Sequence, residues 1–469
     1  MAAQESPGGS DARAQSSSPP LEGHPGDNVE SLWACDDDNG YNSRLPWIRV
    51  LERHVESKVA AWEAGGPLLT DVSRSIAALQ ALAAELTVTV HGSSLTDDDT
   101  PWRARNGERV RVFQENTVSV CLEGPYAQGT AQTDSVCNVT LCGVVTPAAI
   151  DLISAMTPGA ADRRRISRAL QDANSSALHT ARTPHVIQLR LLRFVARDLR
   201  RPNEAELQCM EQLRNARKPL LRARHALHGT LVEISCGSLS GFKAAVIREM
   251  IKMDDRVRPL MIAAARWAQR EGAQVVDGTR KLLTPYALDL LVLFHLQTLR
   301  KPVLPPIREL FPAYQDPDGP RPLDGVVSAE DVDDRVARML VRATELVSTW
   351  RSGNEAGVGQ LLALFVERVA RLTAAWADGT LGNRVPCTWH GAWVAVPDTE
   401  LGRRMLAMGN NVAVVPDPIE SVQNNARNLS MATIQHIAET CRDGQAAFEA
   451  CAALMDQDEI QEQIDLLLP

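Results

Sequence analysis

No apolar run in this 469-residue chain is long enough to cross a bilayer, which takes about 18 consecutive apolar residues or more. The best candidate, from Leu282 to Leu299, contains Asp289 and His295, so a buried helix explains it better. The chain also lacks a positive net charge. Its formal balance of −9 excludes a uniformly basic nucleic-acid coat but allows a local basic groove. We therefore expect no membrane partner.

The sequence lacks C-x-x-C pairs and internal repeats. Its nine cysteines are scattered, which predicts free thiols in a reducing compartment and gives no ligand spacing for a structural zinc site. Residues 1–43 lack the features of a secretory signal or an Arg-rich transit peptide, since Arg13 is their only arginine or lysine. We expect a disordered tail there. These features favour the cytoplasm or the nucleus and leave the mitochondrion open as the compartment.

The first half of the remaining chain mixes helical and strand patterns, and the second half is almost entirely helical. Strands are predicted at 117–123, 137–145 and 229–236, whereas 185–196 alternates like a strand but could also be a helix. Helices are predicted at 45–64, 69–86, 147–156, 161–178, 242–253, 256–271, 284–300, 330–351, 357–376, 420–436 and 438–455, and residues 391–415 could return as strands.

This order predicts an α+β fold in which a small mixed sheet with helices packs against a mostly helical domain. The predicted domains are a tail at 1–43, a mixed domain at 44–241 with insertions at about 88–116 and 199–225, and a helical domain at 242–469.

Two stretches invite comparison with a catalytic turn. "HGSSLTDDDTP" holds Asp97 and Asp99, but Thr-Pro-Trp follows them, which does not make a strand, so an acidic loop explains this stretch better. "EGPYAQGTAQTDSVCNVTL", residues 123–141, has the expected architecture instead. A strand ends at Gly124, a turn follows, and residues 136–139 form a strand of period two.

The second stretch resembles the palm of the non-canonical poly(A) polymerase and terminal uridylyltransferase family. That family's pattern is roughly G-S-[YF]-x-x-G followed by S-D-x-D-h, where h is apolar. The matching positions are Gly124, Tyr126, Gly129 and Ser135. Pro125 replaces the family's serine, and its two aspartates fall on Val136 and Asn138.

Later segments match the same family in its order over about residues 115–450. "LVEIS" resembles the strand that bears the third carboxylate, here Glu233. Further matches are "MDDRVRPLMIAAARWAQREG", "LTPYALDLLVLFHLQ", "KPVLPPIREL" and "VPDPIESVQNNARNLS". The resemblance implies a nucleotidyltransferase palm beside a poly(A)-polymerase-associated domain, and nucleotidyl transfer to RNA 3′ ends with two Mg²⁺ ions.

The residues of this chain depart from that chemistry. Mg²⁺ prefers carboxylate oxygens, but Val136 offers no ligand, Asn138 offers one neutral carbonyl, and only Glu233 keeps a carboxylate. Asp134 is a candidate substitute two residues before Val136, and it could rebuild a site with Glu123 and Glu233. We otherwise predict no metal and no cofactor, with Mg²⁺ and UTP or ATP entering only if a rebuilt site is active.

By the same resemblance the nucleotide side is also altered. The family's two phosphate-binding lysines fall on Ala265 and Gln269, while Arg266 is kept. The family's ribose-contacting asparagine falls on Lys243, and Tyr286 stands where the family stacks the base or simply serves as a core aromatic. The vestigial nucleotide-binding positions are thus Gly124, Pro125, Ser135, Lys243, Arg266 and Tyr286.

The segment 161–224 holds 15 arginines and lysines against six acidic residues, a local balance of +9 in a chain of −9. It could line an RNA groove or form a solvated helical face, and few aromatics are interleaved for base stacking. The candidate RNA contacts are Arg163, Arg164, Arg165, Arg217 and Lys218.

Three hypotheses follow. The first is a catalytically degenerate RNA nucleotidyltransferase that serves as an RNA-associated scaffold or regulatory subunit of an RNA-processing complex, with RNA and protein subunits as partners and no DNA. The second is an active uridylyl- or adenylyltransferase with a rearranged metal site. The third is a protein-binding adaptor that does not bind RNA.

Overall fold

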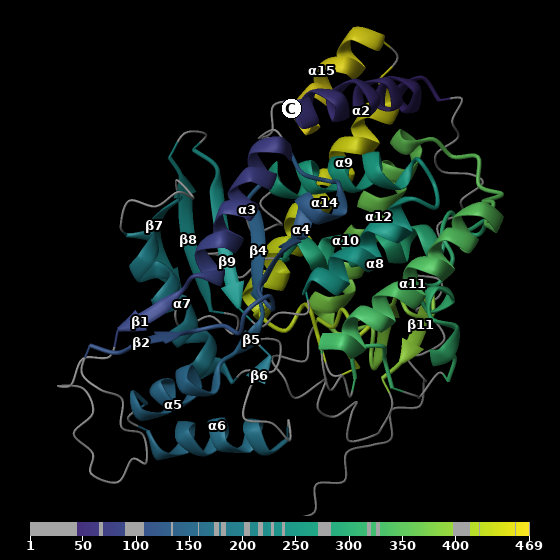
Figure 1. Ribbon diagram of the computed structural model, residues 1–469. Helices are drawn as coiled ribbons and strands as arrows, with labels where there is room; N and C mark the ends of the chain where they lie inside the picture. Colours follow the sequence, from purple (N-terminus) through teal and green to yellow (C-terminus); the bar gives the residue numbers. More distant parts are fainter. Residues whose placement is uncertain are drawn as a thin grey trace, which may run out of the picture.

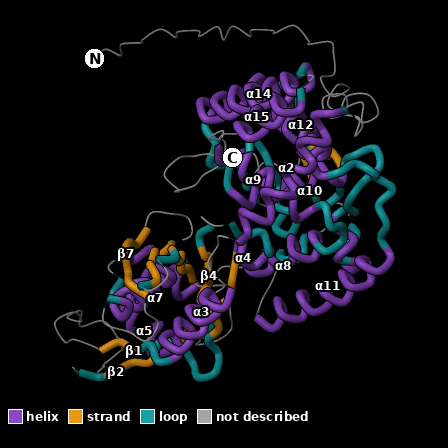
Figure 2. Tube along the Cα trace, turned by 90° about the horizontal axis from the view of Figure 1, so that it is seen from above, coloured by secondary structure: helices purple, strands orange, loops and turns teal. Residues whose placement is uncertain are grey.

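The computed structural model describes residues 45–64, 69–89, 107–132, 135–157, 159–172, 178–179, 184–200, 207–213, 219–226, 229–236, 240–270, 283–316, 320–324, 329–396, 413–421, 423–454 and 456–468. The predicted tail at 1–43 and the acidic loop with Asp97 and Asp99 lie outside these residues. Figure 2 shows most of the strands gathered in one part of the molecule and most of the long helices in another, with α4 and α8 between them. We call residues 69–236 the strand-bearing part and residues 45–64 with 240–468 the helical part.

A mixed five-stranded sheet is the centre of the strand-bearing part. Its order is β3-β4-β9-β8-β7, in which β4 and β9 are parallel and the other neighbours antiparallel. Its strands are β3 (Ser119–Glu123), β4 (Cys137–Cys142), β7 (Leu207–Leu213), β8 (Leu220–His225) and β9 (Leu231–Cys236). Three two-stranded pairs also occur: β1 (Thr87–Thr89) with β2 (Arg109–Arg111), β5 (Val144–Val145) with β6 (Leu178–His179), and β10 (Arg384–Cys387) with β11 (Ala392–Ala395).

One face of this sheet is covered by helices. The helices of this part are α3 (Leu69–Ala84), α4 (Gly124–Gln128), α5 (Pro147–Ala155), α6 (Ala160–Asp172) and α7 (His185–Leu199). α3 contacts β3 and β4, and α7 contacts β7, β8 and β9 (Figure 1). Val139, Leu141 and Ile234 point to this side and join one buried apolar cluster with Leu79 and Leu191. Because side chains alternate along a strand, Asn138 and Glu233 face the other side.

A second apolar cluster fills the helical part. Its helices are α2 (Pro46–Ala64), α8 (Ser240–Ile251), α9 (Val257–Arg270), α10 (Pro285–Gln297), η3 (Ile307–Leu310), η4 (Pro312–Tyr314), α11 (Ala329–Thr349), α12 (Val358–Asp378), α14 (Met431–Ala453) and α15 (Gln457–Leu467). α2 was grouped with the mixed domain at 44–241, yet it packs against α9, α12 and α15. The domain boundaries otherwise stay a prediction. None of the described helices is both long and apolar enough to cross a membrane.

The structure decides one local prediction that was open and changes two others. Residues 185–199 form α7, because Ile187, Leu191 and Val195 recur every four residues and make one buried helical stripe. The segment 199–225, predicted as an insertion, supplies β7 and β8 of the main sheet. In place of helices at 420–436 and 438–455, one helix, α14, begins after Ser430, whose hydroxyl caps it by accepting a hydrogen bond from Thr433 N.

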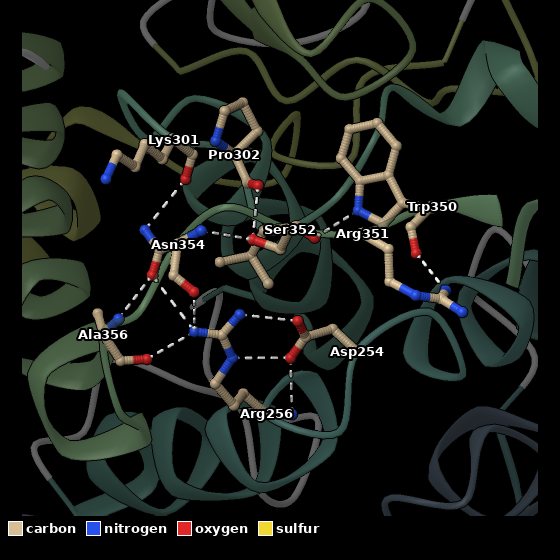
Figure 3. Close-up of polar contacts among 10 residues, drawn as sticks. Asp254, Arg256, Lys301, Pro302, Trp350, Arg351, Ser352, Asn354 and Ala356 are labelled. Carbon is tan, nitrogen blue, oxygen red and sulfur yellow. Dashed lines mark hydrogen bonds and ion pairs between the residues drawn. The ribbon is translucent and has the colours of Figure 1, made fainter. Parts of the chain in front are cut away.

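The corner between α8 and α9 is held by Arg256 of the "DDRVRPL" segment (Figure 3). Its guanidinium forms a two-point ion pair with Asp254, at 2.8 and 2.7 Å. It also donates to the backbone oxygens of Asn354 and Ala356, at 2.9 and 2.7 Å, in the segment that joins α11 to α12. This retained motif therefore braces the helical part.

Candidate functional site

A row of paired side chains crosses the open face of the sheet. Strand register places Glu123 opposite Asn138, Asn138 opposite Glu233, Glu233 opposite Arg222, and Arg222 opposite Glu211. Directly paired residues project from the same face of a sheet, so these five side chains form one ladder. We call it the polar ladder. It contains the third carboxylate position and one of the two lost aspartate positions.

The turn that begins α4 is packed closely against Asn138. Gly124 has φ +62°, and a Cβ placed there would lie 3.1 Å from the Asn138 side-chain amide nitrogen. Asn138 in turn donates this nitrogen to the backbone oxygen of Val136, at 3.2 Å. Val136 itself is half-buried and presents only methyl groups to the cleft. The two former aspartate positions are thus occupied by an apolar side chain and by an amide that braces its own backbone.

Both carboxylates beside Asn138 already have protein partners. Glu123 is 3% exposed, and its Oε1 accepts a hydrogen bond from the Thr140 hydroxyl at 2.5 Å. Glu233 Oε1 accepts from Arg222 Nε at 2.9 Å, and Arg222 also reaches Glu211 at 3.5 Å. Burial alone would lower the pKa of Arg222, but these carboxylates outweigh burial and raise it.

The polar ladder, apart from Glu211, lines a cleft of about 540 Å³ between the sheet and helices α8, α9 and α10. Its lining includes Gly124, Pro125, Ser135, Val136, Asn138, Glu233, Lys243, Ala265, Gln269 and Tyr286, all of which the sequence motifs singled out. Residues distant in sequence therefore meet at one place. The lining is rich in neutral amides: Gln128, Gln132, Asn138, Gln269, Gln423 and Asn425.

Lys243 is held by carboxylates at one wall of the cleft. Its ammonium contacts Asp417 Oδ2 at 2.6 Å and also pairs with Glu420, both in the "DPIE" segment. It lies 5.6 Å from the ring centroid of Tyr286. Burial would lower the pKa of Lys243, but the two carboxylates outweigh burial and raise it. Asp417 has a fully buried side chain, so this cation compensates a charge that water does not reach.

Asp289 is an ionisable cleft residue whose role the motifs did not reveal. Burial raises its pKa to about 7, although a hydrogen bond with Gln128 of α4 acts in the opposite direction. Tyr286 lies one turn earlier on α10. Its pKa is raised well above the ordinary value by burial and by the nearby charges of Asp417, Glu420 and Asp289. These surroundings favour the neutral form of the Asp289 carboxyl.

Other predicted residues lie elsewhere. Arg266 places its guanidinium 5.7 Å from the ring centroid of Trp62 in α2 and does not line the cleft. Ser135 lines the cleft and closes its own turn, since its Oγ accepts from Gln132 N at 2.8 Å. Asp134, Arg217 and Lys218 lie outside the described residues.

Arg163, Arg164 and Arg165 lie on α6, which Figure 1 shows away from α8 and α10. Arg164 and Arg165 are exposed, and Arg165 pairs with Asp162 at 3.1 Å. The cleft and the predicted RNA contacts on α6 are therefore separate surfaces.

The residues present do not fit a two-metal centre. Val136 has no ligand atom, Asn138 keeps only a neutral oxygen, and Glu233 is paired with an arginine. Within the described part of the chain, which leaves out Asp134, no group of three His, Cys, Asp or Glu residues could hold a metal ion. Arg222 and Lys243, the arginine and lysine among the described lining residues, are both held by carboxylates, so the cleft also offers a triphosphate poor charge compensation.

Sequence comparison finds similar proteins, although no protein-family model matches the chain. The mitochondrial poly(A) RNA polymerase of Drosophila melanogaster is 25% identical over 242 residues, which cover 51% of this chain. Poly(A) RNA polymerase GLD2 of Homo sapiens is 30% identical over 107 residues, 23% of this chain. Protein HESO1 of Arabidopsis thaliana is 25% identical over 228 residues, 48% of this chain. The matches span 35%, 22% and 41% of these relatives' own lengths.

Solved structures share the fold. The structure of mtPAP in apo form superposes with a TM-score of 0.56 at 12% identity, covering 98% of this chain and 79% of that one. A cytoplasmic RNA terminal U-transferase superposes with a TM-score of 0.53 at 12% identity, covering 88% and 98%. The α+β prediction of a palm with a mixed sheet beside a helical domain is confirmed. The sequence relatives and the shared fold support the resemblance of this chain to the non-canonical poly(A) polymerase and terminal uridylyltransferase family.

Proposed function

We propose that this chain is a catalytically degenerate RNA nucleotidyltransferase that acts as an RNA-associated scaffold or regulatory subunit of an RNA-processing complex. The observation that carries the proposal is the polar ladder. Where the family's chemistry needs three carboxylates, the ladder and its neighbour offer Val136, Asn138 and a Glu233 that is already neutralised by Arg222. Loss of one such ligand commonly costs several powers of ten in rate, each tenfold being about 1.4 kcal/mol.

The state of the retained motifs supports the same proposal. Thr284 caps α10 by accepting from Ala287 N at 3.2 Å, Asp417 pairs with Lys243, and Arg256 braces the α8–α9 corner. Each of these residues stabilises the fold through contacts that need no nucleotide. The family's architecture is thus kept by packing and capping, while the groups that would hold metal and phosphate are replaced or paired.

Nucleotide binding by the purified chain tests the proposal first. We expect no saturable binding of UTP or ATP to the native chain by calorimetry, with or without Mg²⁺, and no incorporation of any of the four labelled nucleotides on several RNAs. The Val136→Asp/Asn138→Asp variant, measured beside it, reports whether the aspartates alone restore binding. Tight Mg²⁺-dependent binding or incorporation by the native chain would instead establish the alternative with a rearranged site, and Asp134, Glu123 and Glu233 would be mutated next.

The RNA part of the proposal rests on α6 and on the similar proteins, which are RNA polymerases and an RNA transferase. Arg164 and Arg165 are exposed on this helix. Each phosphate contact that a lysine or arginine makes with single-stranded RNA adds about −0.7 to the slope of log affinity against log salt. We expect Arg164→Gln/Arg165→Gln to weaken binding of a labelled RNA severalfold and to make this slope less negative by about 1.4.

The matched control is Arg49→Gln/Arg53→Gln, which removes the same charge from two exposed positions on α2. Fluorescence anisotropy over a KCl series compares the two variants. Equal weakening by both would leave only a non-specific charge effect. A native chain that binds no RNA at low salt but co-purifies with a stable protein would favour the adaptor hypothesis.

A further inference from the structure

Arg222 lies beside Glu233 in the polar ladder and supplies the positive charge that compensates the Glu233 carboxylate. Its Nε lies 2.9 Å from Glu233 Oε1, and its terminal nitrogen lies 3.5 Å from Glu211 Oε2. The Arg222 and Glu233 side chains are 21% and 15% exposed, whereas Glu211 is 54% exposed. The contact with Glu233 is therefore the more sheltered of the two, and screening by solvent weakens it least.

Strand register fixes the guanidinium there. Arg222 is paired with Glu233 on one side and with Glu211 on the other, while its neighbours Leu221 and Ala223 are buried on the opposite face. A shift of β8 by one residue would turn Arg222 into the apolar core and expose the two buried side chains. The arginine is thus a built part of the sheet and cannot slide away from Glu233 at low cost.

A resident guanidinium and a divalent cation compete for the same carboxylate. Glu233 is mostly withdrawn from solvent, so its negative charge needs a counter-charge nearby. Arginine supplies one at every physiological pH, with a fork of donors that suits a carboxylate. A metal ion approaching Glu233 would meet a fixed positive charge and would have to break this pair.

We propose that Arg222 closes the metal position of the cleft, so that divalent cations are excluded from Glu233 even when Val136 and Asn138 are returned to aspartate. This inference rests on the proposed function, because it explains why the same cleft would bind no metal ion. By this proposal, catalytic chemistry is lost through three positions: Val136, Asn138 and Arg222. Arg222 lies on β8 and does not belong to the aspartate motif.

Mn²⁺ binding to full-length variants tests this, measured by the electron paramagnetic resonance of free Mn²⁺. We expect no saturable site below about 1 mM in the native chain or in Val136→Asp/Asn138→Asp, and at least tenfold tighter binding once Arg222→Gln is added, since a gain of ~1.4 kcal/mol is already tenfold. Addition of Glu233→Gln should abolish the new site. Equal binding by the double and triple variants, or no binding by a folded triple variant, would overturn the proposal.

A second comparison covers a triple variant that does not fold. Arg222→Met keeps the apolar stem of the side chain and removes the charge, leaving Glu233 uncompensated in an otherwise native chain. Its melting temperature should rise on addition of 5 mM Mn²⁺ while that of the native chain stays unchanged. Equal shifts would contradict the proposal, as would failure of Arg222→Met to fold in Mn²⁺ when Arg222→Met/Glu233→Gln folds.

The two proposals can fail separately. Mg²⁺-dependent nucleotide binding by the native chain would refute the proposed function, while the comparison of Mn²⁺ binding between variants with and without Arg222 would still decide the role of this residue.

Discussion

At the scale of single residues, the cleft depends on close approach as much as on chemistry. Gly124 combines a left-handed backbone with a neighbouring amide 3.1 Å from where its Cβ would lie. Gly129, at the other end of the same short helix, has φ +82° but no atom within 4 Å of such a Cβ. Both positions therefore require a left-handed backbone, but of the two only Gly124 has a neighbouring atom close to where a Cβ would lie.

This contrast predicts unequal costs for the two alanine substitutions. Gly129→Ala should lower the free energy of unfolding by about 1 kcal/mol, the cost of a left-handed non-glycine residue. Gly124→Ala should cost roughly 1 kcal/mol more, because Asn138 must move and release the backbone oxygen of Val136. Urea unfolding of both variants measures the difference. Equal losses would show that Asn138 yields freely.

Asp289 predicts a pH dependence of stability. Its pKa is about 7 in the folded protein against 3.8 for the ordinary carboxyl, because burial disfavours the charged form. The folded state thus binds this proton more tightly than the unfolded state does. Its stabilising contribution is complete below pH ~4 and is lost as the pH rises through 7.

Asp289→Asn cannot ionise, so it should remove this loss. Between pH 4 and 8 the unfolding free energy of the native chain should fall relative to that of the variant, on the order of 2 kcal/mol for a carboxyl at the wall of an open cleft. Urea unfolding at several pH values gives both curves. Parallel curves would show that Asp289 ionises as freely in the cleft as in the unfolded chain.

The sequence revealed most of the cleft because motifs carry position as well as identity. Val136, Asn138 and Glu233 were placed by their spacing from recognisable neighbours, and strand pairing brings the last two side by side. Arg222 was missed because it belongs to a basic run that suggested an RNA groove. Its signal was present in "LLRARH", whose alternation of buried and open side chains is that of a strand.

At the scale of elements, the sequence was least informative where one pattern fits two structures. Residues 185–196 alternate as a strand does, yet the same apolar residues also recur at helical spacing, and tertiary packing on the sheet selects α7. The start of α14 is set by the hydroxyl cap of Ser430, whereas the apolar periodicity of the sequence extends to both sides of this residue. The remaining differences between the predicted and the observed elements depend on strand register and on pairing between distant segments, which no local sequence pattern contains.

The contacts of Arg256 with the segment between α11 and α12 predict that the stability of the fold depends strongly on this arginine. Arg256→Lys keeps a positive charge beside Asp254 but cannot also donate to the backbone oxygens of Asn354 and Ala356. We expect a loss of about 2–4 kcal/mol in unfolding free energy, from one or two charged hydrogen bonds. Arg338→Lys is the matched control, because its ion pair with Asp334 is exposed on both sides and should matter by less than ~1 kcal/mol. Similar losses in the two variants would contradict the bracing role.

At the scale of the whole molecule, the buried apolar residues of the described part form two large separate clusters, so we expect these two cores to respond separately to damage. Leu51 of α2 and Leu79 of α3 are both almost fully buried, one in each core. Leu→Ala at either position should cost about 2–5 kcal/mol. Hydrogen exchange should show Leu51→Ala deprotecting α12 and α15, and Leu79→Ala deprotecting β3 and β4. Loss of protection in β3 and β4 from Leu51→Ala would show a single cooperative unit.

The packing of α2 on α15 also constrains the order of events during synthesis. His54 Nε2 lies 2.7 Å from the backbone oxygen of Leu468, across 414 positions of chain. At roughly 5–20 residues per second, a ribosome needs about 20–80 s to pass from one to the other. Until the end of that interval α2, with its buried Trp47, Leu51 and Val55, lacks its contacts with α15, although its partners α9 and α12 are made earlier. All five strands of the main sheet are made before α15, so we expect the sheet to pack on its own helices before the helical core is complete.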